Sequence, residues 1–292
     1  MALTGYEVDI NLPAPPQRER GLLLDAAQSI PPDEIVRSNV NRAWLGVKWM
    51  PWGTDMLDLD ASDCDVGYNF TADEPVLRRV PDELIQPAFL MWDALKCSTI
   101  SSTPEWLRAR VVRNLRVYAS AAFAGELATA AASGGLAITG TNLLTPNIIN
   151  ATAQSIRLSM YHLETHLASV LHGAAGMIHV SSGLLGLLVA DDLAEWDGRV
   201  YRSASGHIVV GDPGWTGQYT PYLSSAATGD QEWMYATAPI WYAISEVNTT
   251  EILTDDPGDT NLLKNMNQPF AKRHGVITWD PSATGAIKVT VA

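Results

Sequence analysis

The segment from Ser102 to Gly134 predicts one long helix, and a single element of this length limits the folds open to the chain. Ser102 and Thr103 carry the side-chain oxygens typical of an N-cap, and Pro104 suits a first helical turn. At about 1.5 Å per residue the helix would extend for about 45 Å and could span a domain as its backbone. Its apolar positions recur at helical spacing, while arginines occupy much of the remaining surface of the first turns: Trp106 or Leu107, Val111, Leu115, Tyr118, Ala122 and Gly125 against Arg108, Arg110, Arg113 and Arg116.

Composition narrows the classes of function. The 292 residues are 47% hydrophobic and only 17% charged, whereas soluble domains average about 25% charged residues, so we expect partners to cover part of the surface. A net charge of −13 argues against nucleic-acid binding by the chain as a whole. The start of the chain does not resemble a signal peptide, and no apolar run is long enough to cross a membrane. Cys64 and Cys97 have no metal-binding spacing, which favours a reduced, cytoplasmic protein.

The first hundred residues combine a Pro-rich start with a β-rich region. Residues 1–40 contain Pro13-Ala14-Pro15-Pro16 and predict either a disordered tail or an extended arm that lies on another surface, and no compact core element. Residues 41–100 predict strands rich in Trp around a polar excursion from Gly53 to Asp93. This excursion is strongly acidic. It is either a solvated hairpin and loop or a segment whose ends are anchored on a partner or on the core.

The rest of the chain alternates helices and strands without a repeating order, which predicts an α+β fold. We expect a strand and turn at 136–142 and a polar turn near 255–259. Two further helices are expected, one from Thr145-Pro146 to Gly173 and one at 184–193. The expected strands lie at 177–180, 200–202, 207–210, 233–236, 240–247, 270–279 and 286–291.

No catalytic or metal-binding motif is readable. His162 and His166 lie one helical turn apart, but Leu163 stands where a zinc protease needs a glutamate. His179 lies in an apolar strand, where a histidine is typically a core or boundary residue. Asp191-Asp192 and Asp255-Asp256 are typical of solvated turns. We therefore expect no enzyme, no cofactor and no metal site.

The order of the elements resembles the major capsid proteins of tailed bacteriophages, which have the Hong Kong 97-type fold. Four local stretches resemble capsid proteins of actinobacterial phages: Ala122–Glu126, Met177–Val180, Gly206–Asp212 and Val276–Asp280. The resemblance covers nearly the whole chain. It implies an N-terminal arm (1–40), an E-loop hairpin with flanking strands (41–100), a spine helix and peripheral domain (101–142), an axial domain (143–232), and strands that return to the peripheral domain (233–292).

The resemblance also implies a function. The chain would be a structural protein that assembles into hexamers and pentamers of an icosahedral head around double-stranded DNA, which it would touch weakly and without sequence preference. Assembly would take place in the bacterial cytoplasm. The partners would be a separate scaffold protein and a portal, and the resemblance leaves open whether a decoration protein is also present. The scaffold is expected to be separate because no scaffold segment precedes the hairpin, unless a longer precursor was trimmed. Alternatives are a decoration or tail protein, an encapsulin-like compartment shell, and a small hydrolase.

In this family the E-loop lies over a neighbouring subunit, which here implies a pairing of opposite charges. We expect the acidic hairpin to meet the arginines of the long helix on the adjacent molecule, although these arginines could instead face packaged DNA or solvent. No Lys lies between Lys48 and Lys96, so the covalent Lys–Asn link of some relatives is not expected. The expected interface residues are Trp44, Trp49, Trp52, Asp55, Asp58, Asp60, Arg108, Arg110, Arg113 and Arg116.

Overall fold

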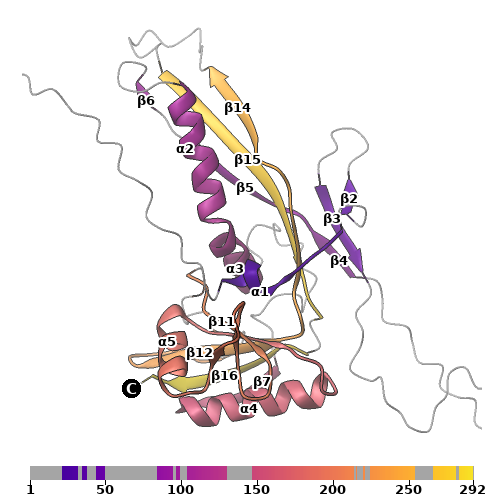
Figure 1. The fold of residues 1–292 in the computed structure, drawn as a ribbon, viewed down its shortest axis with the longest axis vertical. Helices are drawn as coiled ribbons and strands as arrows, with labels where there is room; N and C mark the ends of the chain where they lie inside the picture. Colours follow the sequence, from indigo (N-terminus) through magenta and orange to yellow (C-terminus); the bar gives the residue numbers. More distant parts are fainter. Residues whose placement is uncertain are drawn as a thin grey trace, which may run out of the picture.

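Two large sheets, with helices between and below them, make up most of the described chain (Figure 1). The structure is a computed structural model. It describes residues 22–31, 35–37, 44–49, 84–94, 97–98, 104–129, 147–213, 215, 220, 224–253, 266–280 and 283–291.

The first sheet has six strands and is organised around one long strand, β15. The strands are β1 (Gln28–Ser29), β5 (Phe89–Ala94), β6 (Cys97–Ser98), β13 (Trp241–Ile244), β14 (Asn248–Leu253) and β15 (Met266–Thr278). β15 pairs antiparallel with β5, β6, β13 and β14, while β1 pairs parallel with β13. Strand β14 was not expected from the sequence, whereas β13 and β15 confirm the strands expected there.

Helices α2 (Pro104–Val117) and α3 (Ala119–Thr129) pack on this sheet. Their inward face includes Leu107 and Val111, which are fully buried as the apolar spacing predicts. The expectation of one continuous helix is wrong in detail, because Tyr118 is a turn residue between the two helices. The backbone hydrogen bond from Ala122 N to Tyr118 O, at 3.0 Å, continues across this junction. Ser120 and Phe123 of α3 are both buried.

The second sheet has seven strands in the order β7-β16-β12-β8-β11-β10-β9. Alternate residues along a strand point to opposite faces of the sheet, and on the central strand β12 the residues of both faces are buried. On β12, Trp233 and Tyr235 pack with α2, α3 and the first sheet, while Met234 and Ala236 pack with the helices below. The strands are β7 (Asn147–Ser155), β8 (Met177–His179), β9 (Glu195–Trp196), β10 (Tyr201–Arg202), β11 (Ile208–Val210), β12 (Gln231–Thr237) and β16 (Gly285–Thr290).

Helices α4 (Ile156–Val170) and α5 (Ser182–Ala190) cover the lower face of the seven-stranded sheet. The expected helix from residue 145 begins only at Ile156. Residues 147–155 instead form β7, because they pair parallel with the buried strand β16 at the edge of the sheet. Helix α5 confirms the expected short apolar helix, and the side chain of Ser181 caps it by accepting from Leu184 N at 3.1 Å.

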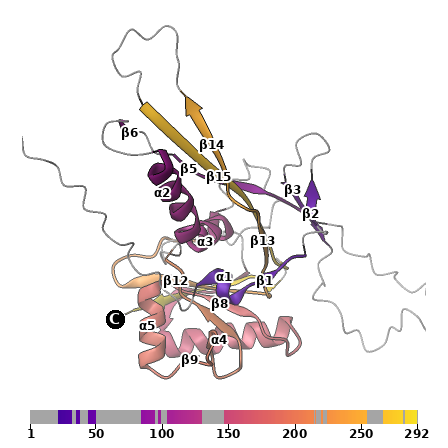
Figure 2. The same ribbon diagram turned by 45° about the horizontal axis from the view of Figure 1, so that its top comes forward.

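A smaller antiparallel sheet stands to one side of both layers in the two views (Figures 1 and 2). It consists of β2 (Ile35–Arg37), β3 (Trp44–Trp49) and β4 (Leu84–Pro87). β3 pairs antiparallel with β4, with Val47 opposite Gln86, and residues 50–83, which join the two strands, lie outside the described residues.

Part of the N-terminal region belongs to the core, contrary to the expectation for residues 1–40. Helix α1 (Leu23–Ala26) inserts Leu23, which is fully buried, among the side chains shared by α3 and both sheets. Ile30 is also buried and packs against Val276 of β15. The prolines on both sides, at 13–16 and 31–32, hid this, although six of the nine residues from 22 to 30 are apolar.

Residues 233–292 divide between the two sheets. β13, β14 and β15 lie in the six-stranded sheet, but most of β12 and all of β16 lie in the seven-stranded one. The domain boundaries inferred from the resemblance stay a prediction. Among the helices that the structure describes, none is long and apolar enough to span a membrane.

Candidate assembly surfaces

The exposed side of α2 is basic. Arg110, Arg113 and Arg116 are exposed and follow one another at three-residue steps, which places them along one side of the helix. Arg108 is half-buried. The guanidinium of Arg110 lies over the ring of Trp106, 5.2 Å from its centroid, which restrains that side chain. A partner approaching α2 from solvent would meet a row of three positive charges.

A further arginine, Arg273, lies on the sheet beneath α2 and within electrostatic reach of Arg116. Arg273 on β15 donates from Nη2 to the carbonyl of Ser245 at 2.9 Å. Burial lowers the pKa of Arg273, and the charge of Arg116 lowers it further, so the two cations lie within electrostatic reach of each other. Because these like charges repel each other, an acidic partner that binds the exposed arginines would be favourable.

Of the hairpin residues in the expected pairing, only the first tryptophans are within the described residues. Trp44 and Trp49 are the first and last residues of β3. Trp52, Asp55, Asp58 and Asp60 lie outside the described residues. The structure therefore places the arginines and the base of the hairpin, and the pairing between them stays a prediction.

An apolar groove runs between β5 and the junction of α2 with α3. Its volume is about 420 Å³. Three large side chains at it stay open to solvent: Trp92 and Tyr118 are each 63% exposed, and Leu90 is 44% exposed. Sequence reasoning placed Tyr118 on the buried face of a continuous helix, and the turn at this residue brings it to the surface instead.

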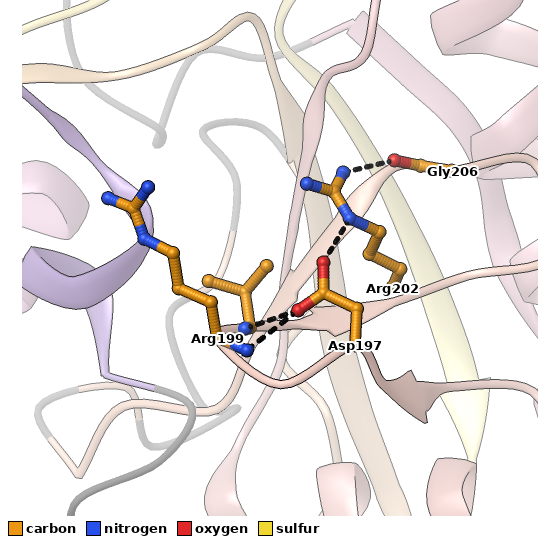
Figure 3. A network of polar contacts seen from close by, with 5 residues as sticks. Asp197, Arg199, Arg202 and Gly206 are labelled. Carbon is orange, nitrogen blue, oxygen red and sulfur yellow. Dashed lines mark hydrogen bonds and ion pairs between the residues drawn. The ribbon is translucent and has the colours of Figure 1, made fainter.

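A second hollow, of about 820 Å³, lies between residues 24–29 and the turn that joins β9 to β10. The carboxylate of Asp197 organises this turn by accepting from the backbone N–H groups of Arg199 and Val200 at 2.8 and 2.9 Å (Figure 3). Arg202 donates from Nε to the same carboxylate and from Nη1 to Gly206 O. The bond from Val200, followed by those from Arg199 and Arg202, lowers the pKa of Asp197 to about 2.

The N-terminal segment is fastened to the body by a buried carboxylate, Asp212, which sequence reasoning missed. It is 1% exposed and accepts from the Ser120 hydroxyl at 2.5 Å and from Leu23 N at 3.0 Å. Nearby, burial and then the charge of Asp212 raise the pKa of Asp25, while Arg199 lowers it. The motif Gly211-Asp212-Pro213-Gly214 predicted only a loop, and no signal in it marked the carboxylate.

The histidines considered as candidate catalytic or metal-binding residues do not form one site. The ring of His162 packs on Tyr161, with 5.4 Å between the ring centroids. His166 makes a 3.3 Å contact from Nε2 to Ala283 O, and burial lowers its pKa. His179 is buried in β8, 2.9 Å from the Thr237 hydroxyl, and burial lowers its pKa to about 3. Within the described ranges, no three His, Cys, Asp or Glu side chains gather as metal ligands would.

Comparison with known proteins gives a structural likeness without a sequence match. No protein-family model matches the chain. No curated protein matches it either. Among solved structures, the capsid of an empty GTA particle superposes with a TM-score of 0.53 at 12% identity, covering 99% of this chain and 98% of that one. A chain of the Gordonia phage Cozz structure superposes with a TM-score of 0.56 at 10% identity, covering 99% of this chain and 92% of that one.

The chain has the Hong Kong 97-type capsid fold. The α+β class expected from the sequence is confirmed with it. The native GTA particle, with a TM-score of 0.50 and 11% identity over 99% of this chain, has the same arrangement. The assignment of α2 and α3 to the spine helix, and of β3 and β4 to the base of the E-loop, stays a prediction.

Proposed function

We propose that this chain is the major capsid protein of a tailed bacteriophage, a structural subunit that assembles into hexamers and pentamers of an icosahedral head around double-stranded DNA. The observation that carries the proposal is the likeness of fold along whole chains: 99% of this chain corresponds to 98% of a GTA capsid chain. Because the alignment covers almost all of both chains, neither chain has a sizeable extra domain that would support a different role.

The surface of the subunit supports this proposal. Tyr161 on α4 is 60% exposed, although an aromatic residue of this size favours burial. Aromatic residues and arginine are enriched in protein interfaces, and stable assemblies bury a few thousand square ångströms of such surface. The low charged fraction of 17% fits a subunit whose neighbours cover much of it.

We further propose that neighbouring subunits meet through opposite charges. The acidic stretch of the hairpin, which includes Asp55, Asp58 and Asp60, would lie against the arginines of α2 on the adjacent molecule. The exposed row of Arg110, Arg113 and Arg116 supports this role because it has the sign and the access that the pairing needs. Trp44, Trp49 and Trp52 would anchor the hairpin beside it. The competing occupants of the arginines are packaged DNA, held weakly and without sequence preference, and solvent.

The proposed role includes several partners and a location. A separate scaffold protein and a portal would take part in assembly, and a decoration protein is a further candidate where the shell needs additional contacts. The chain would assemble in the cytoplasm of the bacterial host and remain in the virion capsid. It would have no catalytic activity of its own.

Negative-stain electron microscopy of the protein, expressed alone and with its neighbouring reading frames, tests the proposal. Closed icosahedral particles, or rings of five and six subunits, are expected. Tubes, trimers or binding only to preformed shells would contradict it in favour of a tail or decoration protein. A small discrete species under both conditions would favour an accessory protein or a hydrolase. Particles from infected cells should protect DNA from nuclease, whereas protein cargo without DNA would indicate a compartment shell.

A further inference from the structure

The groove between β5 and the helices is a preformed apolar site with aromatic side chains at its edge. Trp92 and Tyr118 flank it, each 63% exposed, and Leu90 adds a third apolar side chain. Among the described residues that line it, two are acidic, Asp93 and Glu126, and none is Lys or Arg. A ligand for this site would therefore be apolar, extended and bordered by positive charge.

The walls of the groove are fixed by contacts that do not depend on a ligand. The ring of Trp92 stacks on Phe270, with 6.0 Å between centroids, and Phe89 packs edge-on against Phe123 at 4.8 Å. Asp93 accepts a hydrogen bond from the Asn114 side chain at 2.8 Å, which ties β5 to α2. Binding here would need little rearrangement, so little of the interaction free energy would be lost to ordering the site.

The chain itself contains a segment with the matching chemistry. Residues 12–16 read Leu-Pro-Ala-Pro-Pro. Proline-rich segments of this kind favour the extended polyproline II conformation, and proteins bind them in grooves lined by aromatic side chains, because the ligand loses little conformational entropy on binding. Arg18 and Arg20 follow the prolines and match the acidic residues of the groove in sign.

The segment can reach the groove of its own molecule. The amide of Leu24 donates to the Ser120 hydroxyl at 3.3 Å, which places the start of the described chain against α3. Ser120 lies two residues from both Tyr118 and Ala122, which line the groove on the other side of the helix. Pro16 and Leu22 are six positions apart, with five residues between them. In polyproline II these six steps span about 19 Å, at about 3.1 Å per residue. This is enough to pass around a helix about 10–12 Å in diameter.

We propose that residues 12–16 dock as a polyproline II segment in the groove of the same chain, between Trp92 and Tyr118. A tethered segment has a high effective concentration at a site within its reach, so docking in the same chain is favoured over capture of another molecule. The docked segment would cover two of the most exposed aromatic side chains of the described residues. This inference does not depend on the proposed shell function.

Cross-linking tests the proposal in the full-length protein. Cys64 and Cys97 are replaced by Ser, and cysteines are introduced by A14C in the proline segment and A122C in the groove. A short bis-maleimide is added to the dilute protein. We expect one cross-link within the chain, seen by peptide mass spectrometry and as a monomer with altered mobility on a denaturing gel. The matched control pairs A14C with A168C, an exposed alanine on α4, and should not cross-link.

A cross-link could also form if the undocked segment only meets the groove by chance. A second measurement, which uses no cross-linker, tests this. Labelling of A122C by a bulky maleimide should be slow in the parent sequence. It should become several-fold faster when Pro13, Pro15 and Pro16 are replaced by Ser, with the circular dichroism spectrum unchanged. Equal labelling rates would overturn the proposal. Cross-links mainly between chains would also overturn it, because they would assign the groove to a second copy.

Discussion

The carboxylate of Asp212 accepts a hydrogen bond from the hydroxyl of Ser120 at 2.5 Å, although the two residues lie 92 positions apart. The same carboxylate accepts from the amide of Leu23 at 3.0 Å, across 189 positions. One buried acidic side chain thus joins the N-terminal segment, α3 and the loop after β11. Hydrogen bonds to a buried charged group contribute more to stability than neutral ones, because the alternative is an unsatisfied charge.

Replacing Asp212 should therefore loosen the whole subunit. We expect D212A to lower the free energy of unfolding by about 1.5–3 kcal/mol, since it leaves the Ser120 and Leu23 donors unpaired in the core. Urea unfolding followed by tryptophan fluorescence measures this. D230N, at an exposed aspartate, is the matched control and should change stability by less than about 0.5 kcal/mol. Purely additive effects of D212A and S120A would contradict direct coupling between these two residues.

Stability should fall as the medium becomes acidic, because His179 is buried in its neutral form. Burial lowers its pKa from 6.5 to about 3 in the folded state. The unfolded chain takes up a proton below pH 6.5 that the folded chain refuses. The contribution of His179 is therefore complete above 6.5 and is lost as the pH falls towards 3. The loss approaches about 1.4 kcal/mol per pH unit.

Urea midpoints measured at pH 7, 6 and 5 check this dependence. H179Q should flatten the decline, although it will not abolish it, because burial also lowers the pKa values of His166 and His207. H172N is the control: His172 is exposed and has a φ of 49°, a conformation that Asn adopts readily. An unchanged slope in H179Q would show that His179 does not carry the effect.

Two glycines should respond to the same substitution with opposite signs. A Cβ at Gly275 would lie 2.7 Å from ring atoms of both Phe89 and Phe123, so G275A should destabilise the protein by about 1–3 kcal/mol through overpacking. Gly186 lies on the exposed side of α5 with nothing within 4 Å of the added Cβ. G186A should stabilise by about 0.5–1 kcal/mol, because alanine favours the helix. Thermal unfolding of the two variants side by side measures both effects.

Reversing two charges on α2 should interfere with assembly but not with folding. The double variant R110E/R113E would repel an acidic partner segment, whereas both side chains are exposed and their loss should leave the monomer intact. We expect few or misshapen particles by electron microscopy. R157E, on the exposed side of α4, is the control and should assemble normally. Normal shells from the double variant would refute the pairing of these arginines with the hairpin.

Purified particles should contain no covalent links between subunits. The chain has no Lys between positions 48 and 96, so the hairpin lacks the amine that an isopeptide bond to a neighbouring Asn would need. Boiled particles on a denaturing gel should give one band at about the mass of the 31.6 kDa chain. A ladder of multiples that persists under reducing conditions would disprove this prediction.

The elements with a strong local signal could be predicted from the sequence. The basic and buried sides of α2, the strand at Met177 and the hairpin around Ser203–Gly206 followed from periodicity and turn residues. β7 could not be predicted, because Asn147–Ser155 contains helix-compatible residues and becomes a strand only through its pairing with β16, more than a hundred residues later. Propensity is a weak guide where such distant pairing decides the conformation.

The surfaces were harder to predict than the strands. Of the four arginines expected on the surface of α2, Arg110, Arg113 and Arg116 are exposed, since charged residues outside an apolar stripe remain in solvent, whereas Arg108 is half-buried. The groove beside Trp92 and Tyr118 was not, because it depends on the turn at Tyr118 and on the packing of β5 against the helices. Asp212 was missed for a similar reason: its donors, Ser120 and Leu23, come from segments that nothing in the local sequence connects to it.

The position of β16 has a consequence for how the protein is made. Residues 285–290 are among the last of the chain, yet they lie between β7 and β12 inside the seven-stranded sheet. A ribosome that has released only the first 280 residues has not yet supplied the strand that holds these two together. Because domains fold as units during synthesis, this half of the subunit is completed only after residue 290 has left the ribosome, so shorter nascent chains lack a finished seven-stranded sheet.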